Sequence, residues 1–326
     1  MKYLVLGGQN RVGALGKAEW SKFELAVAMV VDVKSKASHR VLEYTSPLDV
    51  TASDDARAVL FKAGALQNDH LYLCTQTEVL VYSYPDLKQV RYLSLPCFND
   101  LHHVRPGQDG NLLVVSTGLD MVFEIDDQDR VFREWTTVKG SGWERFDRDT
   151  DYRTWSTTKP HLSHPNYVFD VDGEHWVTRF EQRDAVCLDD WSRRIPIDVQ
   201  RPHDGEYFNG RIYFTTVDGH VVIADASTHE RIEVHDLNGI EGVDYSLGWC
   251  RGLRVVDDHR VIVGYSRIRP TKIRENIRWV RHKLGKETSG LRPSRIAQYD
   301  LKTGTLEWEH ILEDAGLNAI FSIHEA

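Results

Sequence analysis

The sequence predicts an all-β protein: a six-bladed β-propeller with four-stranded antiparallel blades, formed by a single domain over residues 1–326. Two observations predict this fold. A pattern of four short strands with tight turns between them recurs at intervals of about 40 residues, which is typical of propeller blades. The two ends of the chain also supply the four strands of the remaining blade, so the ring closes without an unpaired strand edge.

The third blade shows the repeat most clearly, as four segments that alternate apolar and polar residues or form short apolar runs between turn residues. These segments are His102–Val104, Asp109–Val115, Met121–Asp126 and Val131–Trp135. The same pattern predicts the strands of the second blade at Ala58–Ala63, Leu71–Thr75, Val79–Tyr82 and Val90–Leu95. It predicts those of the fourth at Asn166–Val171, Trp176–Phe180, Ala185–Leu188 and Arg194–Val199. It predicts those of the fifth at Gly205–Phe208, Arg211–Thr216, Val221–Ala224 and Arg231–Leu237. The sixth blade is predicted at Arg251–Val256, Arg260–Tyr265, Ile296–Asp300 and Leu306–Leu312, and the first at Lys2–Leu6, Glu24–Val33, Arg40–Tyr44 and the C-terminal Asn318–Ile323.

Four connections are much longer than the others, namely residues 7–22, 137–163, 238–248 and 267–295. In a four-stranded meander all four emerge on the same face of the ring, and the histidine-bearing strands begin on that face. Long loops in a compact repeat protein usually carry function. The sequence therefore predicts a binding site on this face.

Two of these connections have a distinctive composition. Residues 137–163 contain Trp143, Phe146, Tyr152 and Trp155, which predicts either an aromatic lid over the site or a loop packed on apolar surface. Residues 267–295 contain ten lysines or arginines and two glutamates, with apolar residues at helical spacing. They predict a short basic helix inserted in the last blade.

The basic insertion bears on which partners the protein can have. A basic helix would attract an anionic group or contact a protein partner, although such a charge run is also typical of a solvated face. Nucleic acid is not favoured, because the whole chain has a net charge of −9 and the remainder would repel a phosphate backbone. We expect a small anionic substrate.

Five histidines are predicted to gather near the axis: His102, His103, His164, His203 and His324. Either His102 or His103 would face inward. Neutral imidazoles from several blades are suitable ligands for a divalent transition metal such as Zn, Fe or Mn, which would leave one position open for substrate. The alternatives are metal-free acid–base groups and histidines that simply fill a polar channel.

Other polar residues lie close to the same strand ends. The candidate catalytic residues are Asp100, Asp204 and Arg251, and the candidate substrate-binding residues are Thr117, Arg179, Gln182, Arg183 and Trp249. An arginine near the axis is a natural clamp for a carboxylate, since its guanidinium can donate two parallel hydrogen bonds. The alternative for Arg251, which begins an inner strand, is an ion pair with Asp100 or Asp204.

Several classes of protein are not indicated. The segment Leu4–Gly13 has a strand and glycines but no following βαβ unit, so no nucleotide cofactor is expected. No apolar run approaches the length of a membrane span, and the N-terminal apolar stretch is too short for a signal peptide. The four cysteines are scattered, with Cys74 and Cys187 inside apolar runs. We expect a cytoplasmic protein with buried free thiols.

The six-blade pattern, with its repeated hairpin of the Asp109–Thr117 type, resembles the broad group of NHL-like, gluconolactonase-like and strictosidine-synthase-like propellers. That group includes calcium lactonases, a glutamate-dependent condensing enzyme and a zinc lyase with a histidine from several blades, and only the last is similar to the histidines here. We therefore expect a metal-dependent lyase, hydrolase or cyclase acting on a small anionic molecule in the axial mouth. The alternatives are a non-catalytic ligand-binding or protein-interaction propeller and a metal-free enzyme that uses His and Asp as acid and base.

Overall fold

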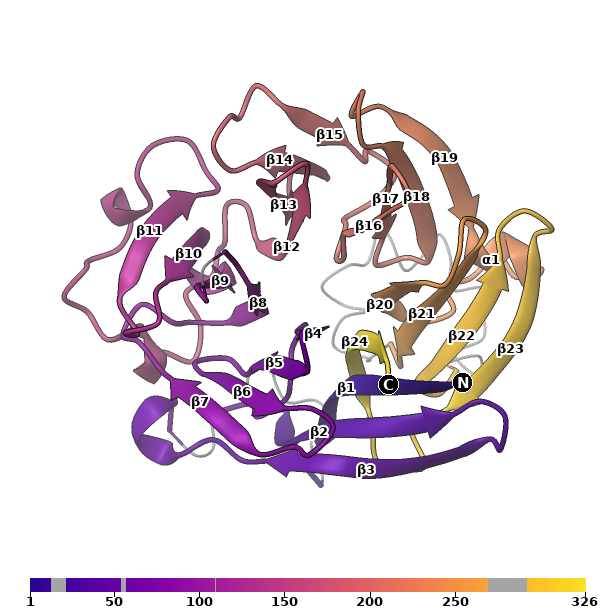
Figure 1. The fold of residues 1–326 in the computed structure, drawn as a ribbon, viewed down its shortest axis with the longest axis horizontal. Helices are drawn as coiled ribbons and strands as arrows, with labels where there is room; N and C mark the ends of the chain where they lie inside the picture. The colour runs from indigo at the N-terminus through magenta and orange to yellow at the C-terminus, as the bar shows by residue number, and fades with distance from the viewer. Residues whose placement is uncertain (13–21, 54–56, 109, 269–291) are drawn as a thin grey trace.

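The structure, a computed structural model, describes residues 1–12, 22–53, 57–108, 110–268 and 292–326. Six sheets of four antiparallel strands stand in a ring, with one strand of each sheet nearest the centre (Figure 1). The predicted six-bladed β-propeller is therefore confirmed.

The strands follow one another from the axis outward in every blade. The innermost strands are β4 (Ala65–Gln67), β8 (Leu101–Pro106), β12 (Pro165–Val171), β16 (Glu206–Phe208), β20 (Trp249–Val255) and β24 (Ala319–Glu325). The second strands are β1 (Lys2–Asn10), β5 (His70–Cys74), β9 (Leu112–Ser116), β13 (Glu174–Arg179), β17 (Arg211–Thr215) and β21 (Arg260–Ser266). The third are β2 (Phe23–Asp32), β6 (Val79–Ser83), β10 (Met121–Ile125), β14 (Asp184–Cys187), β18 (His220–Asp225) and β22 (Arg295–Asp300). The outer strands are β3 (Ala37–Tyr44), β7 (Gln89–Leu93), β11 (Val131–Thr136), β15 (Arg194–Pro196), β19 (Arg231–Asp236) and β23 (Thr305–Ile311).

The two termini share one blade, as the strand count predicts. Its strand order is β24-β1-β2-β3, so β1 pairs with the C-terminal strand on one side and with β2 on the other. Leu4, for example, lies opposite both His324 and Val30. Figure 1 shows the indigo and yellow ends of the chain meeting in this blade. The C-terminal strand thereby contributes to the wall around the axis.

The hydrophobic core is divided among the contacts between neighbouring blades. Between the third and fourth blades, Val115 and Val122 pack with Val168 and Val177, all fully buried. Each such side chain contributes about 1.5–3 kcal/mol to folding through its removal from water. Because most of the apolar residues face the adjoining blades, polar side chains can line the space along the axis together with a smaller apolar cluster that includes Phe23, Leu60 and Phe321.

The second blade differs from the prediction at its innermost strand. That strand is β4 (Ala65–Gln67), not Ala58–Ala63. Residues 58–63 instead donate backbone hydrogen bonds to four different strands. The amides of Val59, Phe61, Lys62 and Ala63 donate to the carbonyls of Phe23 in β2, Gly7 in β1, Cys74 in β5 and His102 in β8. This segment bridges the first three blades, so it forms no continuous ladder of its own, and it carries Lys62 to the axis.

The structure describes the 137–163 connection but not most of the 267–295 connection, so the predictions for these two segments compare differently with it. In residues 137–163, Trp143, Phe146 and Tyr152 pack against the core of the third blade, while residues further along turn toward the axis. Trp143, Phe146 and Tyr152 therefore anchor the loop, while Trp155 is half exposed and contacts Tyr152, with ring centres 5.3 Å apart. The predicted basic helix lies outside the described residues, since they break off between 268 and 292.

Short helical turns complete the chain. They are the α-helix α1 (Leu237–Ile240), which begins the 238–248 connection, and 3-10 turns at Leu48–Val50, Thr117–Leu119, Gly142–Glu144 and Tyr152–Thr154. Within the described ranges, no helix has the length and apolar character needed to cross a membrane. All four cysteines are free, and Cys74 and Cys187 are buried as predicted.

Candidate functional site

A cavity of about 480 Å³ opens on the axis where the innermost strands begin, and we call it the first mouth. His102, His203, Trp249 and Arg251 line it from three of these strands or the residues just before them. Residues 156–161 of the long 137–163 connection line it as well, apart from Thr158. A cavity therefore lies on the face where the site is predicted, lined by three of the five predicted histidines, His102, His164 and His203.

Phe321 lines the first mouth and contacts several of its polar side chains, although no sequence pattern indicated it. The guanidinium carbon of Arg251 is 3.5 Å from the centre of its ring, and the Lys62 ammonium is 4.9 Å from the same point. The rings of His203 and His102 lie 5.8 Å and 6.5 Å from it. A cation over an aromatic face is held by the quadrupole of the ring, so Phe321 orients both basic side chains.

Lys62 donates hydrogen bonds to two of the predicted site residues, Asp100 and His102. Its ammonium donates to Asp100 Oδ1 at 3.1 Å and to His102 Nε2 at 3.2 Å. Burial acts to raise the pKa of Asp100, but the charge of the Lys62 ammonium, with a smaller effect of the neighbouring His102, outweighs it and holds that pKa well below its usual range. Asp100 is thus an anion at neutral pH, and Lys62 neutralises it. The sequence signal for Lys62 was its position as the one charged residue in the apolar run 58–63.

The tautomer of His102 follows from its neighbours. The side-chain amide of Asn166 donates to the Pro202 carbonyl at 2.9 Å, which directs its oxygen toward His102 Nδ1 at 2.6 Å. His102 must then carry its proton on Nδ1, and Nε2 keeps a lone pair. Burial, followed by the charge of Lys62, lowers the pKa of His102 to about 4. The imidazole is therefore neutral and presents an acceptor to the first mouth.

His203 is the most exceptional of the histidines. Its side chain is almost completely buried, and within the described part of the chain neither ring nitrogen has a hydrogen-bond partner. Nδ1 lies 3.6 Å from Asp204 Oδ1, while the other oxygen of Asp204 accepts the Thr215 hydroxyl and the Gly252 amide. The carboxylate favours a proton on Nδ1, which leaves the Nε2 lone pair unused. Burial lowers the pKa of His203, so the ring is neutral.

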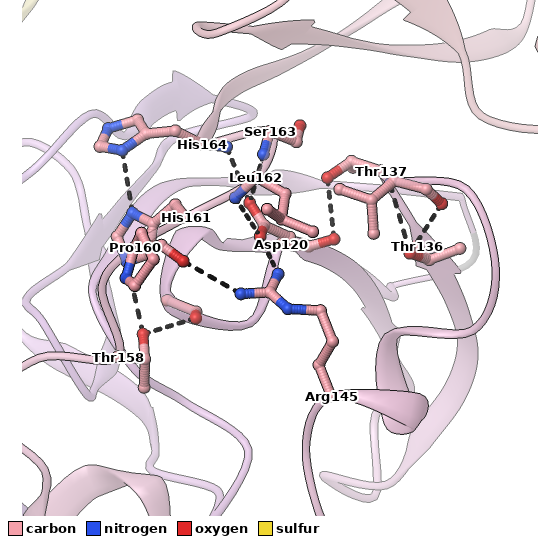
Figure 2. Close-up of polar contacts among 12 residues, drawn as sticks. Asp120, Thr136, Thr137, Arg145, Thr158, Pro160, His161, Leu162, Ser163 and His164 are labelled. Atoms are coloured by element: carbon pink, nitrogen blue, oxygen red, sulfur yellow. Dashed lines mark hydrogen bonds and ion pairs between the residues drawn. The ribbon is translucent and has the colours of Figure 1, made fainter.

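His164 also has its proton on Nδ1 and a lone pair on Nε2, because of a chain of hydrogen bonds through His161 and Thr158 (Figure 2). The Thr158 hydroxyl donates to the Gly118 carbonyl, so its oxygen accepts from His161 Nε2 at 3.3 Å. His161 Nδ1 then accepts from His164 Nδ1 at 3.0 Å. His164 Nε2 is left as a lone pair. Burial lowers the pKa of both imidazoles, most strongly that of His164.

Asp120 positions this pair, as the dashed lines of Figure 2 show. Its fully buried carboxylate accepts the backbone amides of Leu162, Ser163 and His164 at 2.8, 3.0 and 2.8 Å. It also accepts the Arg145 guanidinium at 2.6 Å. His164 has a φ of 53°, in the left-handed region, which a non-glycine residue adopts at a cost that the surrounding contacts must offset. Asp120 supplies those contacts.

Four of the predicted substrate-binding residues lie elsewhere, away from the lining of the first mouth. Arg179 is paired with Asp184 at 2.7 Å, and it lies directly opposite Asp184 on the neighbouring strand. Arg183 is exposed at the turn between these strands. The Gln182 amide donates to the Leu162 carbonyl, and the buried Thr117 hydroxyl donates to the Pro165 carbonyl. Of that group, Trp249 alone lines the first mouth.

The five predicted metal ligands are divided between the two ends of the axis. His102, His164 and His203 line the first mouth, whereas His103 and His324 line a separate cavity of about 370 Å³ where the innermost strands end. We call this cavity the second mouth. Asp204, a predicted catalytic residue, lines the second mouth and lies 3.6 Å from His203 of the first.

The metal site remains a prediction. In the part of the chain that the structure describes, no group of three or more His, Cys, Asp or Glu side chains is arranged to hold a metal ion. The ring centres of His102 and His164 are 4.9 Å apart and those of His102 and His203 are 6.0 Å apart. The Lys62 ammonium, however, occupies the acceptor nitrogen of His102.

The buried imidazoles predict that the protein loses stability in mild acid. The pKa of His102 falls from about 6.5 in the unfolded chain to about 4 in the fold. The native state therefore binds fewer protons than the unfolded state, and the stability that is present above about pH 6.5 is lost as pH falls toward 4. His102 alone accounts for about 3 kcal/mol. Urea unfolding followed from about pH 7 to 4.5 should show this loss, with a shallower slope in His102→Gln.

Comparison with known proteins supports the fold. No protein-family model matches the chain, and no curated protein matches it. A protein of unknown function from Bacteroides caccae is similar in structure, with a TM-score of 0.62 and 13% identity over 99% of this chain and 97% of that one. A catalytically inactive variant of virginiamycin B lyase from Staphylococcus aureus, solved with quinupristin, has a TM-score of 0.47 and 13% identity over 73% of this chain and 69% of that one. Likeness at this level of identity describes the architecture alone, and that architecture is a six-bladed β-propeller.

Proposed function

We propose that the first mouth is the active site of an enzyme that acts on a small anionic molecule by acid–base chemistry, with His203 as the general base. The observation that carries the proposal is the unused Nε2 lone pair of a buried, neutral imidazole in the wall of a cavity. A neutral imidazole with its other nitrogen toward a carboxylate has the tautomer that a base requires.

Charge favours an anionic substrate. Four basic side chains line the first mouth, namely Lys62, Lys159, Arg201 and Arg251, against the carboxylates of Asp100 and Glu181. Arg201 pairs with Glu181 at 3.1 Å and Lys62 with Asp100. The lining therefore has a formal excess of positive charge, inside a partly closed space where charge attracts more strongly than in bulk water.

The arrangement supports removal of a proton next to the anionic group. His203 Nε2 would accept the proton, and Lys62 would stabilise negative charge that develops on a neighbouring oxygen. Arg251, held over Phe321, would position the carboxylate or phosphate of the substrate. Such a step begins an elimination or an isomerisation, so a lyase or an isomerase fits the site best.

A deuterium-exchange experiment tests the base. In D2O, a panel of 2-hydroxy and 2-oxo carboxylates is incubated with the protein. Loss of the C2 proton of the 2-hydroxy acids, and enzyme-dependent loss of the C3 protons of the 2-oxo acids, is followed by 1H NMR. We expect at least one member to exchange, and His203→Gln to slow that exchange by about 100-fold or more while binding persists. His39→Gln, on the exposed surface of β3, is the matched control.

Two outcomes would contradict this proposal in different ways. Exchange that proceeds equally fast in His203→Gln would remove His203 from the chemistry. Carboxylates that bind in the first mouth without exchange in any variant would favour the alternative of a ligand-binding propeller.

A second candidate function is metal-dependent chemistry in the first mouth, and the tautomers of its three histidines support it. His102, His164 and His203 each direct Nδ1 toward a partner and keep Nε2 as a lone pair, which is the state of metal-binding imidazoles. Their Nε2 atoms and an Asp100 oxygen would hold a divalent transition metal once the Lys62 ammonium moves aside. The metal would supply a Lewis acid for the substrate oxygen.

Metal analysis of untagged protein tests this candidate. Near-stoichiometric zinc, iron or manganese that is lost in His164→Ala His203→Ala is the expected result if a metal is resident. Substoichiometric metal with the same content in the double variant would remove the candidate and leave the acid–base proposal standing.

A further inference from the structure

The second mouth is a separate cavity with its own chemistry. It lies where the innermost strands end, as Arg105 near the end of β8, Asp170 near the end of β12 and Arg254 near the end of β20 show. The proposed chemistry of the first mouth requires none of these side chains. A polar cavity of about 370 Å³ on the axis is large enough for a small molecule.

His103 provides the first indication that this cavity takes a ligand. Its Nδ1 accepts the Val168 amide at 3.1 Å, and its ring stacks on Tyr167 with ring centres 3.7 Å apart. Burial, followed by the charge of Arg105, holds the pKa of His103 well below its usual range, so the ring is neutral. The remaining proton must then reside on Nε2.

This Nε2–H group is a donor without an acceptor. The side chain of His103 is 1% exposed, and Nε2 has no hydrogen-bond partner within the ranges that the structure describes. The backbone of Gly64 lies close enough to raise the pKa of His103 slightly, but its carbonyl is too poorly aligned with Nε2 to satisfy this donor. Leaving a buried donor unpaired costs about 1–3 kcal/mol, which a ligand oxygen in the second mouth would recover.

The charges of the second mouth differ from those of the first. Its two guanidinium groups are already paired, Arg105 with Asp170 and Arg254 with Glu206, both at 2.9 Å. Asp204 adds a third carboxylate. The lining has no excess of positive charge, so an anion would gain little here. Ion pairs of this kind instead offer donors and acceptors side by side, which suits hydroxyl groups, because a hydroxyl both donates and accepts.

We propose that the second mouth binds a small uncharged molecule rich in hydroxyl groups, a polyol or monosaccharide, with one oxygen accepting from His103 Nε2. Its other hydroxyls donate to Glu206 and Asp170 and accept from Arg254 and Arg105. The proposal stands independently of the chemistry in the first mouth, because the two cavities share no lining residue.

NMR of histidine-selectively 15N-labelled full-length protein tests this site directly. The His103 Nε2 resonance is assigned by its absence in His103→Gln, and the protein is titrated separately with myo-inositol, D-glucose, inorganic phosphate and glycine. Concentrations up to about 50 mM cover millimolar affinities. We expect a saturable shift of the His103 resonance with at least one of the two hydroxyl-rich probes, and no shift of the His203 resonance.

A test variant and a control variant show whether the ligand binds in the second mouth. Burial raises the pKa of Glu206 to about 7, so the titrations are run at about pH 8, where its carboxylate is mostly ionised. Glu206→Gln then removes a charged acceptor, and we expect it to weaken the binding about tenfold or more. Glu230→Gln, at an exposed turn, should leave binding unchanged. The proposal is overturned if neither hydroxyl-rich probe shifts the His103 resonance, or if phosphate or glycine shifts it more strongly than they do. Loss of the proposed activity of His203 in the first mouth would have no bearing on this result.

Discussion

Replacement of Asp120 by alanine is expected to lower the free energy of unfolding by about 3–5 kcal/mol. The reason is that one buried carboxylate accepts three consecutive backbone amides and the Arg145 guanidinium. In the alanine variant the Ser163 amide is left buried without its acceptor, and Arg145 loses its counter-ion. Chemical denaturation monitored by tryptophan fluorescence would measure the loss.

The same substitution should also disorganise the first mouth. His161 and His164 are held by the segment that Asp120 anchors, so the contact between their Nδ1 atoms should be lost (Figure 2). In 15N NMR spectra of the imidazoles, the two rings should no longer show opposite neutral tautomers. Asp120→Asn, which keeps one acceptor oxygen but no charge, should fall between the wild type and the alanine variant.

Asp126→Ala is the matched control. Asp126 also accepts backbone amides, from Gln128 and Arg130, and also pairs with an arginine, Arg130 at 2.8 Å. That arginine, however, is 68% exposed, and surface pairs of this kind contribute about 1 kcal/mol or less. Equal losses in Asp120→Ala and Asp126→Ala would show that burial of the Asp120 network has no special effect.

The histidines of the first mouth could be predicted from the sequence because the blades repeat. The repeat fixes where each innermost strand begins, and a propeller brings those points together, so His102, His164 and His203 could be predicted to meet. The repeat does not specify how far along the axis a side chain lies. His103 follows His102 by one residue and His324 lies on the C-terminal strand, yet both line the opposite cavity.

Arg179 illustrates a different limit of prediction from the sequence. It was predicted to bind substrate from its place in a loop on the functional face, but Asp184 lies directly opposite it across the hairpin and satisfies its charge. A cross-strand pair of opposite charge is a local feature, and the spacing of five residues around a turn could have indicated it. Lys62 and Phe321 were harder to find. Lys62 interrupts an apolar run but belongs to no functional motif, and both residues gain their roles from contacts between blades.

Lys62→Met is expected to have opposite effects on the two kinds of ligand proposed for the first mouth. The ammonium is a charged donor for an anion, and its loss should weaken binding of inorganic phosphate by about 10- to 100-fold. It also occupies His102 Nε2 and neutralises Asp100, so its removal frees an imidazole and a carboxylate. The same variant should therefore bind Zn²⁺ more tightly than the wild type.

Isothermal titration calorimetry with phosphate and, separately, with Zn²⁺ distinguishes the possibilities. Lys302→Met, on the exposed turn between β22 and β23, is the control, and it should match the wild type in both titrations. If phosphate binding is unchanged in Lys62→Met, this lysine does not contact the anion, and the proposed role of its ammonium in the chemistry fails with it. If phosphate binding weakens while Zn²⁺ gains nothing, the three imidazoles do not converge on a metal even when the competing cation is gone. That pair of results would leave His203 as a metal-free base, because its unused lone pair depends on Asp204 and not on Lys62.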